Sequence, residues 1–300
     1  MAGIVFVDGE YVAPEDARMS IFDAGFTYGD TVYDVTSAWN GYVFKLDEHL
    51  ERLQRSCDGF RLTNPHTTGE TREIIGECMA RSELDDAYIK VEVTRGVIPK
   101  HGRDLREARQ RLVAYALPYI WIWSEEKCRN GSSIHLSRRF ERVSSRAVDA
   151  RFKNYNRADM VQARLDAYEC GCDDALLVGV DGSVTEGFGW NLLIVRDGAV
   201  ATPADNVLEG MTRESVAEIC EAEAIPYEQR RVWPYELEEA DEIFAATTAG
   251  GVMPIIALDG TAVGSGSAGP ITRRIQDLYW SKRTAGWHGT AATDLVGATA

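Results

Sequence analysis

Lys153, in the stretch RFKNYNRADM at residues 151–160, is the residue whose type and setting suit covalent chemistry. It precedes a helix expected over residues 158–171 and lies between Phe152 and Tyr155. A lysine is usually a solvated charge on a flexible stem, whereas a buried amine can form a Schiff base with a carbonyl compound. The stretch alone favours a solvated surface lysine. Whether Lys153 is instead a buried amine depends on the residues elsewhere in the chain.

Glu186, in VTEGFGWNLLIV, is the second candidate. It is either a turn acid in solvent or a buried partner for a protonated ring nitrogen. Gly187 and Gly189 beside it indicate that something approaches the backbone closely. The stretch is not a dinucleotide fingerprint, because Asn191 and a strand follow where a third glycine and a helix would be required.

Two further segments suit a phosphate group. NVLEGMTRES places Met211 and Thr212 at an expected helix N-terminus, where free backbone amides bind anions, although Thr212 as a plain N-cap needs no ligand. AATTAGG ends a strand at Thr247 and Thr248, which form either an anion cradle or a tight turn. One amine, one acid and two phosphate segments are the protein groups that pyridoxal phosphate requires.

The composition excludes several classes of protein. The chain has 300 residues, 45% of them hydrophobic, and a formal charge of −15, which disfavours nucleic acid as a partner. No apolar run approaches the roughly 20 residues that cross a bilayer, so we expect no membrane association. The six cysteines and five histidines are dispersed, which predicts reduced thiols, a cytoplasmic location and no metal site.

The elements that must position these residues predict an α+β fold. Hairpins are expected at residues 4–12 and 33–46, helices at 46–60 and 68–82, and strands at 87–97 and 111–119. The second half alternates strands and helices up to a helix at 271–280. Pro118 and the YIWIW run predict a small N-terminal α/β domain at 1–117, a linker at 118–125 and a larger mixed-sheet C-terminal domain at 126–300. The residues from His288 on lack periodicity and are expected to fray.

The order Lys153, EGFGWN, LEGMTR and TTAGG resembles the class IV aminotransferases. These are the fold-type IV pyridoxal-phosphate enzymes, which include branched-chain, D-amino-acid and (R)-selective amine transaminases. The resemblance covers nearly the whole chain, since SIFDAGFTYGDTVYDV and HLERLQRS in the first half also match. It implies a two-domain fold like that of D-amino-acid aminotransferase, with the site in the cleft between the domains and completed by a second subunit in a homodimer.

The resemblance also implies individual roles. Lys153 would carry the cofactor as a Schiff base and move the proton, and Glu186 would pair with the pyridine nitrogen. The phosphate would be held by Arg52, Met211, Thr212, Thr247 and Thr248. For Arg52 the alternative is a helix-surface ion pair with Glu48 or Glu51.

The substrate side is expected to include Tyr33 and Val35, alternate residues of one strand, with Tyr28, Tyr88 and Ala249. The substrate carboxylate has three candidate partners: Lys90, and His101 and Arg103 of the charged loop at 98–110, which is either a movable element or an ordinary hairpin loop. Lys90 is either a snorkelling edge residue or a positive group aimed at an acidic substrate.

The YIWIW run, SIFDAGFTYGD and TTAGGVMPI look most like the (R)-amine branch. That branch usually has a histidine at the place of Tyr28, and Gln-Trp-Gly at the place of Asn156-Arg157-Ala158. We therefore expect a transaminase that moves an amino group from an (R)-amine or D-amino acid to a 2-oxo acid such as pyruvate or 2-oxoglutarate. The alternatives are a branched-chain L-amino-acid aminotransferase, a lyase resembling aminodeoxychorismate lyase, and a cofactor-free binding protein.

Overall fold

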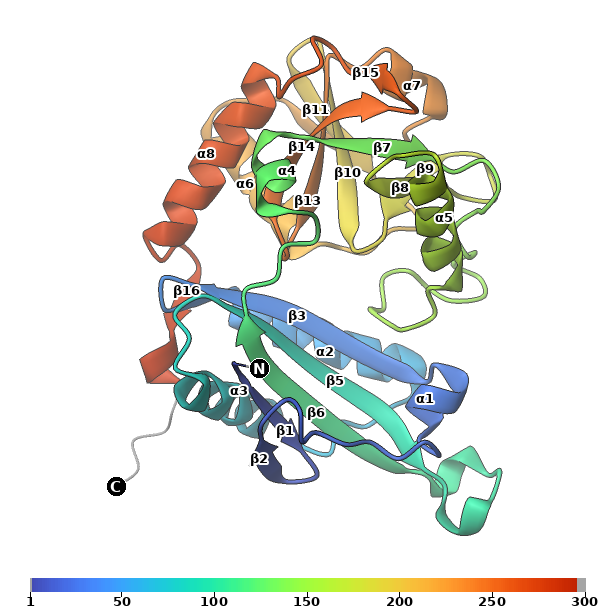
Figure 1. Ribbon diagram of the computed structural model, residues 1–300, viewed down its shortest axis with the longest axis vertical. Helices are drawn as coiled ribbons and strands as arrows, with labels where there is room; N and C mark the ends of the chain where they lie inside the picture. Colours follow the sequence, from blue (N-terminus) through green and yellow to red (C-terminus); the bar gives the residue numbers. More distant parts are fainter. Residues whose placement is uncertain (1, 296–300) are drawn as a thin grey trace. The chain divides into compact units, whose positions relative to one another are not determined.

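The computed structural model describes residues 2–295 (Figure 1). The chain forms two compact units, and two of its later segments return to the first unit. Within the described residues, unit 1 consists of residues 2–120, Phe152–Asn156 and residues 283–295, and unit 2 of Trp121–Arg151 and Arg157–Lys282. The first junction lies inside the linker expected at 118–125. The return of residues 152–156, which carry Lys153, to unit 1 was not expected.

Unit 1 is built on a seven-stranded antiparallel sheet in the order β16-β4-β3-β5-β6-β1-β2. Its strands are β1 (Ile4–Val7), β2 (Glu10–Val12), β3 (Thr31–Trp39), β4 (Tyr42–Phe44), β5 (Ala87–Val97), β6 (Arg109–Pro118) and β16 (Gly289–Ala291). Its helices are α1 (Ala24–Tyr28), α2 (Leu46–Phe60) and α3 (Thr68–Ser82), and short 3-10 turns lie at Pro99–His101, Leu105–Glu107 and Ala292–Asp294.

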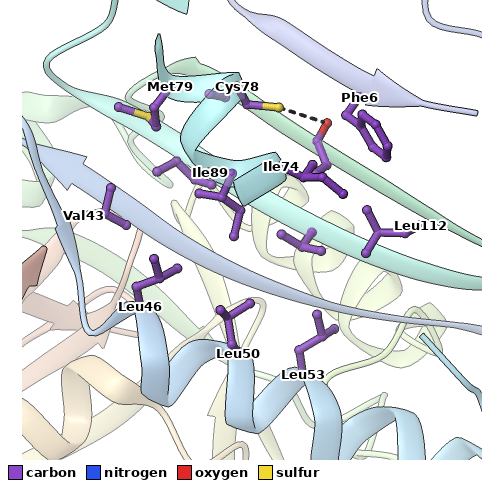
Figure 2. Packing of buried hydrophobic residues seen from close by; sticks show 14 of the residues in the cluster. Phe6, Val43, Leu46, Leu50, Leu53, Ile74, Cys78, Met79, Ile89 and Leu112 are labelled. Atoms are coloured by element: carbon purple, nitrogen blue, oxygen red, sulfur yellow. Dashed lines mark hydrogen bonds between the residues drawn. The ribbon is translucent and has the colours of Figure 1, made fainter. Parts of the chain in front are cut away.

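Helices α2 and α3 cover one face of this sheet, and the core of the unit lies between them and the strands (Figure 2). Helix α2 contributes Leu46, Leu50 and Leu53 at the spacing of one helix face, and they pack with Ile89 and other strand residues. The expectation that the chain frays from His288 on is wrong for the described part. Gly289–Ala291 pairs with β4, and Leu295 is buried in this core.

Unit 2 contains a closed six-stranded barrel, because β9 pairs back with β10 in the order β10-β13-β14-β7-β8-β9. The strands are β7 (Ser132–Leu136), β8 (Asp174–Val178), β9 (Val184–Gly187), β10 (Trp190–Arg196), β13 (Glu242–Thr247) and β14 (Gly251–Leu258). Alternate residues of all six strands form one buried apolar cluster, as expected inside a small barrel. β11 (Ala199–Pro203), β12 (Tyr227–Arg230) and β15 (Thr261–Ala262) extend the sheet outside the ring.

The helices of unit 2 are α4 (Glu125–Asn130), α5 (Ala158–Glu169), α6 (Met211–Ala222), α7 (Pro234–Glu238) and α8 (Pro270–Thr284). Helix α5 packs Met160, Ala163 and Ala167 against β8. The N-terminus of α8 is capped by the buried carboxylate of Glu242, which accepts hydrogen bonds from the amides of Ile271 and Thr272. None of the helices in residues 2–295 is long and apolar enough to span a membrane.

Segment 152–156 forms an isolated antiparallel bridge, between Asn154 and Val32, with the sheet of unit 1. β4 pairs with β3 only at Ala38 and Trp39, so the other end of β3 has a free edge. There the amide of Tyr33 donates to the carbonyl of Lys153 at 3.0 Å, and the amide of Tyr155 donates to the carbonyl of Thr31 at 3.3 Å. The segment is also fixed to α2, where Ser56 Oγ accepts from the Lys153 amide at 3.0 Å.

Phe152, the residue before Lys153, packs against Gly59 of α2. A Cβ at this glycine would come within 2.4 Å of the Phe152 ring, a distance that real Cβ atoms do not tolerate. The absence of a side chain at Gly59 therefore lets the segment lie directly on the helix. Gly59 is inside a helix, where glycine otherwise costs stability relative to alanine.

Gly59→Ala should destabilise the protein by about 1–3 kcal/mol, because the gain in helix propensity is smaller than the cost of overpacking. The matched control is Gly69→Ala in α3, where the nearest atom is 4.0 Å from an added Cβ. It should be neutral or stabilising by up to about 1 kcal/mol. Urea denaturation of both variants measures the difference, and equal stabilities would show that Phe152 does not rest on Gly59.

Candidate active site

Lys153 lies on the face of the unit 1 sheet that is opposite to helices α2 and α3. Asn154 bridges Val32, a core residue of the helix-covered face, so its neighbours Lys153 and Tyr155 point to the other face. Lys153 Nζ lies 4.9 Å from the centre of the Tyr33 ring, and the rings of Tyr33 and Tyr155 are 4.9 Å apart. The side chain of Lys153 is partly buried rather than extended into solvent.

Strand pairing brings several of the predicted substrate residues to this same face. In the β3–β5 register Tyr33 lies opposite Glu92, Val35 opposite Lys90, and Ser37 opposite Tyr88. Paired residues of antiparallel strands share a face, so Val35, Tyr88 and Lys90 accompany Tyr33. Tyr33 and Val35 lie on one face of β3, as the alternation along the strand predicts, and Tyr88 shares that face. Their contact with a substrate stays a prediction.

Lys90 is not a snorkelling edge residue, because β5 lies between β3 and β6 in the middle of the sheet. Its Nζ forms an ion pair with Glu92 Oε1 at 2.7 Å and contacts the hydroxyl of Tyr155. It also lies 4.6 Å from the ring centres of Tyr33 and Tyr155. Sequence reasoning included Lys90 but missed its partner Glu92, although the two residues are alternate positions of one strand.

The remaining predicted substrate residues lie elsewhere. Tyr28 ends α1 and is 64% exposed. The turn that contains His101 begins after β5, and Arg103 follows it as an exposed residue. The loop starts about five residues beyond Glu92, which corresponds to roughly 16 Å of strand. Ala249 is in unit 2, in the turn between β13 and β14, where its carbonyl accepts from the Ile122 amide.

Arg52 is buried, and the alternative of a surface ion pair with Glu48 or Glu51 is wrong. Its Nε and Nη2 donate to the two carboxylate oxygens of Asp34, each at 2.8 Å. His49 Nδ1 lies 2.6 Å from Asp34 Oδ1. This cluster is on the helix-covered face, because Asp34 lies opposite the core residue Val91. Asp34 and His49 were not identified from the sequence as part of the site. The alternation of residues along the strand places the acidic Asp34 on a buried face, and this was a signal that it has a buried basic partner.

Burial and the neighbouring charges determine the protonation of Asp34 and His49 in this cluster. Burial penalises the Asp34 carboxylate, but the charge of Arg52 and then that of His49 outweigh burial and hold the pKa of Asp34 well below its usual value. Burial lowers the pKa of His49 despite the opposing effect of Asp34. A neutral His49 that donates from Nδ1 presents a lone pair at Nε2, which has no hydrogen-bond partner among the described residues. His49 and Asp34 line a cavity of about 10 Å³, close to the space that one water requires.

In unit 2, Glu186 is a buried residue of β9, so the interpretation as a turn acid in solvent is wrong. Its Oε1 faces Arg142 Nε at 3.3 Å, and its Oε2 accepts from the Leu208 amide at 3.0 Å. Arg142 also pairs with Asp159 of α5 at 2.8 Å. Arg157 lies nearby; burial lowers its pKa, and the charges of Glu186 and Asp159 oppose that shift. The carboxylate of Glu186 is therefore held in a fixed orientation.

Of the two glycines beside Glu186, Gly187 is explained by Trp190. A Cβ at Gly187 would come within 2.0 Å of the Trp190 indole, whose Nε1 donates to buried Asp174 at 3.0 Å. The close approach expected from the sequence is thus made by a side chain of the same hairpin. Asn191, which sequence reasoning did not assign, holds the Leu208 carbonyl and packs so tightly on Gly210 that an added Cβ would lie 2.0 Å away.

Helix α6 begins at Met211 and its N-cap is Gly210, so the interpretation of Thr212 as the N-cap is wrong. No side chain caps this terminus, and the first amide that bonds back to the turn is that of Glu214, which donates to the Gly210 carbonyl. Helix amides before that point have no intrahelical acceptor. Thr212, the second helical residue, is buried. This uncapped 12-residue helix therefore keeps the donors that suit an anion.

Thr247 and Thr248 lie at the turn between β13 and β14. The hydroxyl of Thr247 donates to the Gly189 carbonyl at 2.7 Å, so it ties this turn to the hairpin of Glu186. Gly250 and Gly251 follow with φ of 156° and 69°. A Cβ at Gly251 would come within 2.7 Å of Tyr279, so α8 packs directly on the turn. The segment is therefore a tight turn, and its use as an anion cradle stays a prediction.

The segment from residue 31 to residue 258 matches the family model described as amino-transferase class IV. The chain belongs to this family. It is 31% identical to a putative branched-chain-amino-acid aminotransferase of Methanocaldococcus jannaschii, over 93% of this chain and 96% of that protein. It is 29% identical to the D-alanine aminotransferase of Staphylococcus haemolyticus, over 92% of this chain and 96% of that one.

Solved structures agree with the family assignment. The T.th. branched-chain amino acid aminotransferase, complexed with N-(5'-phosphopyridoxyl)-L-glutamate, superposes with a TM-score of 0.89 at 27% identity, over 97% of this chain and 99% of that chain. The branched-chain aminotransferase of Thermoproteus uzoniensis with norvaline gives a TM-score of 0.89 at 29% identity with the same coverage. The fold-type IV architecture is therefore confirmed, and the chain is an aminotransferase.

Asp34→Asn should make the protein much less stable at pH 7, by about 3–5 kcal/mol, because it removes the buried carboxylate that pairs with the buried Arg52 charge. Both Asp34 and His49 bind fewer protons in the folded state, so the wild type loses stability as the pH falls, below about 6.5 for His49 and below about 4 for Asp34. The gap between wild type and variant should therefore narrow below about pH 4.

Urea denaturation at several pH values measures this gap. The control is Asp47→Asn, which removes the acid of an exposed pair with Arg72 and should change stability little at any pH. A gap of constant size from pH 7 to pH 3 would mean that the Asp34 charge does not stabilise the fold.

Proposed function

We propose that this protein is a pyridoxal-phosphate-dependent transaminase that moves an amino group from an (R)-amine or D-amino acid to a 2-oxo acid through a Schiff base at Lys153. The observation that carries the proposal is the position of Lys153, which the edge of β3 and helix α2 hold so that its amine lies against the Tyr33 ring. Membership of the class IV aminotransferases and the phosphopyridoxyl ligand of the T.th. neighbour support the cofactor.

The residues of the chain fit this cofactor in type. Lys153 provides the amine for covalent attachment, and Glu186 provides a buried, oriented carboxylate for a ring nitrogen. Met211 and Thr212, at the uncapped start of α6, provide amides and a hydroxyl for a phosphate, and Arg52, Thr247 and Thr248 complete the proposed set. Nε2 of His49, which has no hydrogen-bond partner within residues 2–295, is a further polar group near the Lys153 charge.

Each group has a defined task. When bound, pyridoxal phosphate supplies an electron sink for the bond broken at the donor's α carbon. Lys153 Nζ takes the proton from that carbon and returns a proton when the acceptor is aminated. Glu186 would present its carboxylate to the ring nitrogen, and Arg142 holds that carboxylate in place. Tyr33, with Val35 and Tyr88 on the same face, limits the access of water to the amine.

The substrate side has a polar and an aromatic part. Tyr28, Tyr33, Val35, Tyr88 and Ala249 are proposed to form its walls, and Lys90, His101 or Arg103 to bind the substrate carboxylate. A second candidate function is branched-chain L-amino-acid transamination, which the similarity to the Methanocaldococcus jannaschii and Thermoproteus uzoniensis proteins favours. Nothing comparable favours the lyase, because the matched family and these relatives are described as aminotransferases.

The active form is proposed to be a cytoplasmic homodimer. Ile21, Phe26 and Tyr28 are large apolar or aromatic residues in one short segment and are 67%, 75% and 64% exposed, which suits a surface that another copy covers. The six cysteines are all free thiols, as expected in a reducing compartment. Sedimentation velocity at micromolar concentration distinguishes the dimer from a monomer of 33.2 kDa.

Lys153→Met should abolish covalent attachment of the cofactor and lower turnover by several orders of magnitude, while the thermal unfolding temperature stays close to that of the wild type. Borohydride reduction followed by intact-mass measurement detects the attachment. The control is Lys100→Met, an exposed lysine of the same unit, which should leave attachment and turnover unchanged. Normal turnover in the Lys153 variant would exclude the proposed role.

A panel of donors with pyruvate as acceptor tests the proposed substrate class. We expect (R)-1-phenylethylamine or D-alanine to be converted at least about tenfold more efficiently in kcat/KM than L-leucine and L-valine. The opposite order would identify the chain as a branched-chain L-amino-acid aminotransferase, and the S-amine serves as the stereochemical control.

A further inference from the structure

Lys90 and Glu92 form a neutralised ion pair beside the proposed reactive amine. They occupy alternate positions of β5, their charged atoms are 2.7 Å apart, and each side chain is only 12% exposed. The Tyr155 hydroxyl donates to the same Glu92 oxygen at 2.6 Å. The Lys90 ammonium and the Glu92 carboxylate are therefore paired and largely desolvated. Their net charge is close to zero.

Aromatic rings enclose this pair. Lys90 Nζ lies 4.6 Å from the ring centres of Tyr33 and Tyr155 and 5.8 Å from that of Tyr115, distances at which ring faces attract a cation. Burial and then the Glu92 charge raise the pKa values of Tyr88, Tyr115 and Tyr155, so these phenols stay neutral near pH 7. The cluster therefore contains one positive and one negative group in an aromatic surround.

The pair is close to Lys153. The amines of Lys90 and Lys153 both contact the Tyr33 ring, at 4.6 Å and 4.9 Å from its centre, so they are separated by at most about twice this distance. A substrate bound at Lys153 would therefore lie near the Lys90–Glu92 ion pair.

We propose that Glu92 is a specificity-determining residue that makes this transaminase prefer 2-oxo acids with an uncharged side chain, such as pyruvate, over dicarboxylic 2-oxo acids. The proposal rests on the proposed function. A second substrate carboxylate near Lys90 has to compete with Glu92 for the same ammonium, and whichever carboxylate loses remains poorly solvated and without a counter-charge. An uncharged side chain meets only the tyrosine rings and avoids this cost.

Glu92→Gln keeps the shape of the side chain and removes its charge, which releases the Lys90 ammonium for a second carboxylate. The ratio of kcat/KM for 2-oxoglutarate to that for pyruvate should rise about 10- to 100-fold, as expected for one new hydrogen-bonded charge pair. Lys90→Met, which leaves Glu92 without its cation, should move the ratio in the opposite direction. The double variant Lys90→Met/Glu92→Gln should bring it back toward the wild-type value.

Two controls make the result specific. Glu73→Gln removes one exposed carboxylate from α3, on the other face of the sheet, and should leave the ratio unchanged. Glutarate and pentanoate both have five carbon atoms, but glutarate has a second carboxylate. Calorimetric measurement of their binding reports the preference for or against a second carboxylate without any turnover. Glu92→Gln should strengthen glutarate binding relative to pentanoate, and Lys90→Met should weaken it.

The outcomes separate this inference from the proposed function. Active variants whose acceptor ratio and glutarate preference equal those of the wild type would overturn the role of Glu92 and leave the transaminase assignment intact. An inactive wild type with every donor and acceptor would overturn the proposed function, whereas the glutarate and pentanoate measurements would still report on the pair. A ratio that shifts equally in Glu73→Gln would also contradict the proposal, because it would reflect net charge alone.

Discussion

The free edge of β3 is the constraint on which the arrangement in unit 1 depends. An unpaired strand end leaves backbone amides and carbonyls without partners, and residues 153–155 satisfy Thr31 and Tyr33 there. Because pairing fixes the alternation of side chains, it also fixes the face to which Lys153 points. Helix α2 reinforces this placement with one stripe of residues, since His49, Arg52, Ser56 and Gly59 follow helical spacing and all contact β3 or the segment at 152–156.

Adjacent residues of β3 serve opposite faces of one sheet. Asp34 points toward α2 and neutralises the buried charge of Arg52, whereas Tyr33 and Val35 point to the face of Lys90 and Lys153. Each face thus carries a compact ion pair, one beneath the helices and one among tyrosines. A shift of β3 by one residue in its pairing register would turn each of these side chains to the opposite face of the sheet, where its partner is absent. The two ion pairs therefore disfavour such a shift.

Most elements, the family and the types of the candidate groups were predictable from sequence, because period-2 and helical patterns are strong in TVYDVTSAW, AYIKVEVTRGV and LDEHLERLQRS. The hydrogen-bond partners were not. Asp34 and Arg52 are 18 residues apart and Glu186 and Arg142 are 44 apart, and no local pattern links such positions. The same limitation explains why Arg52 was open to a surface interpretation. The fold was recognisable from local order, whereas the pairing of charges required the tertiary contacts.

Unit 1 also includes the far end of the described chain. Arg283 donates to Ser37, Gly289–Ala291 extends the sheet beside β4, and Leu295 enters the core that α2 and α3 cover. During ribosomal synthesis the first 120 residues therefore emerge long before the strand and the apolar side chain that complete their own unit. Until then the outer edge of β4 has no partner, and the barrel strands of unit 2 leave the ribosome in the meantime. The unit translated first is thus the last that can be completed.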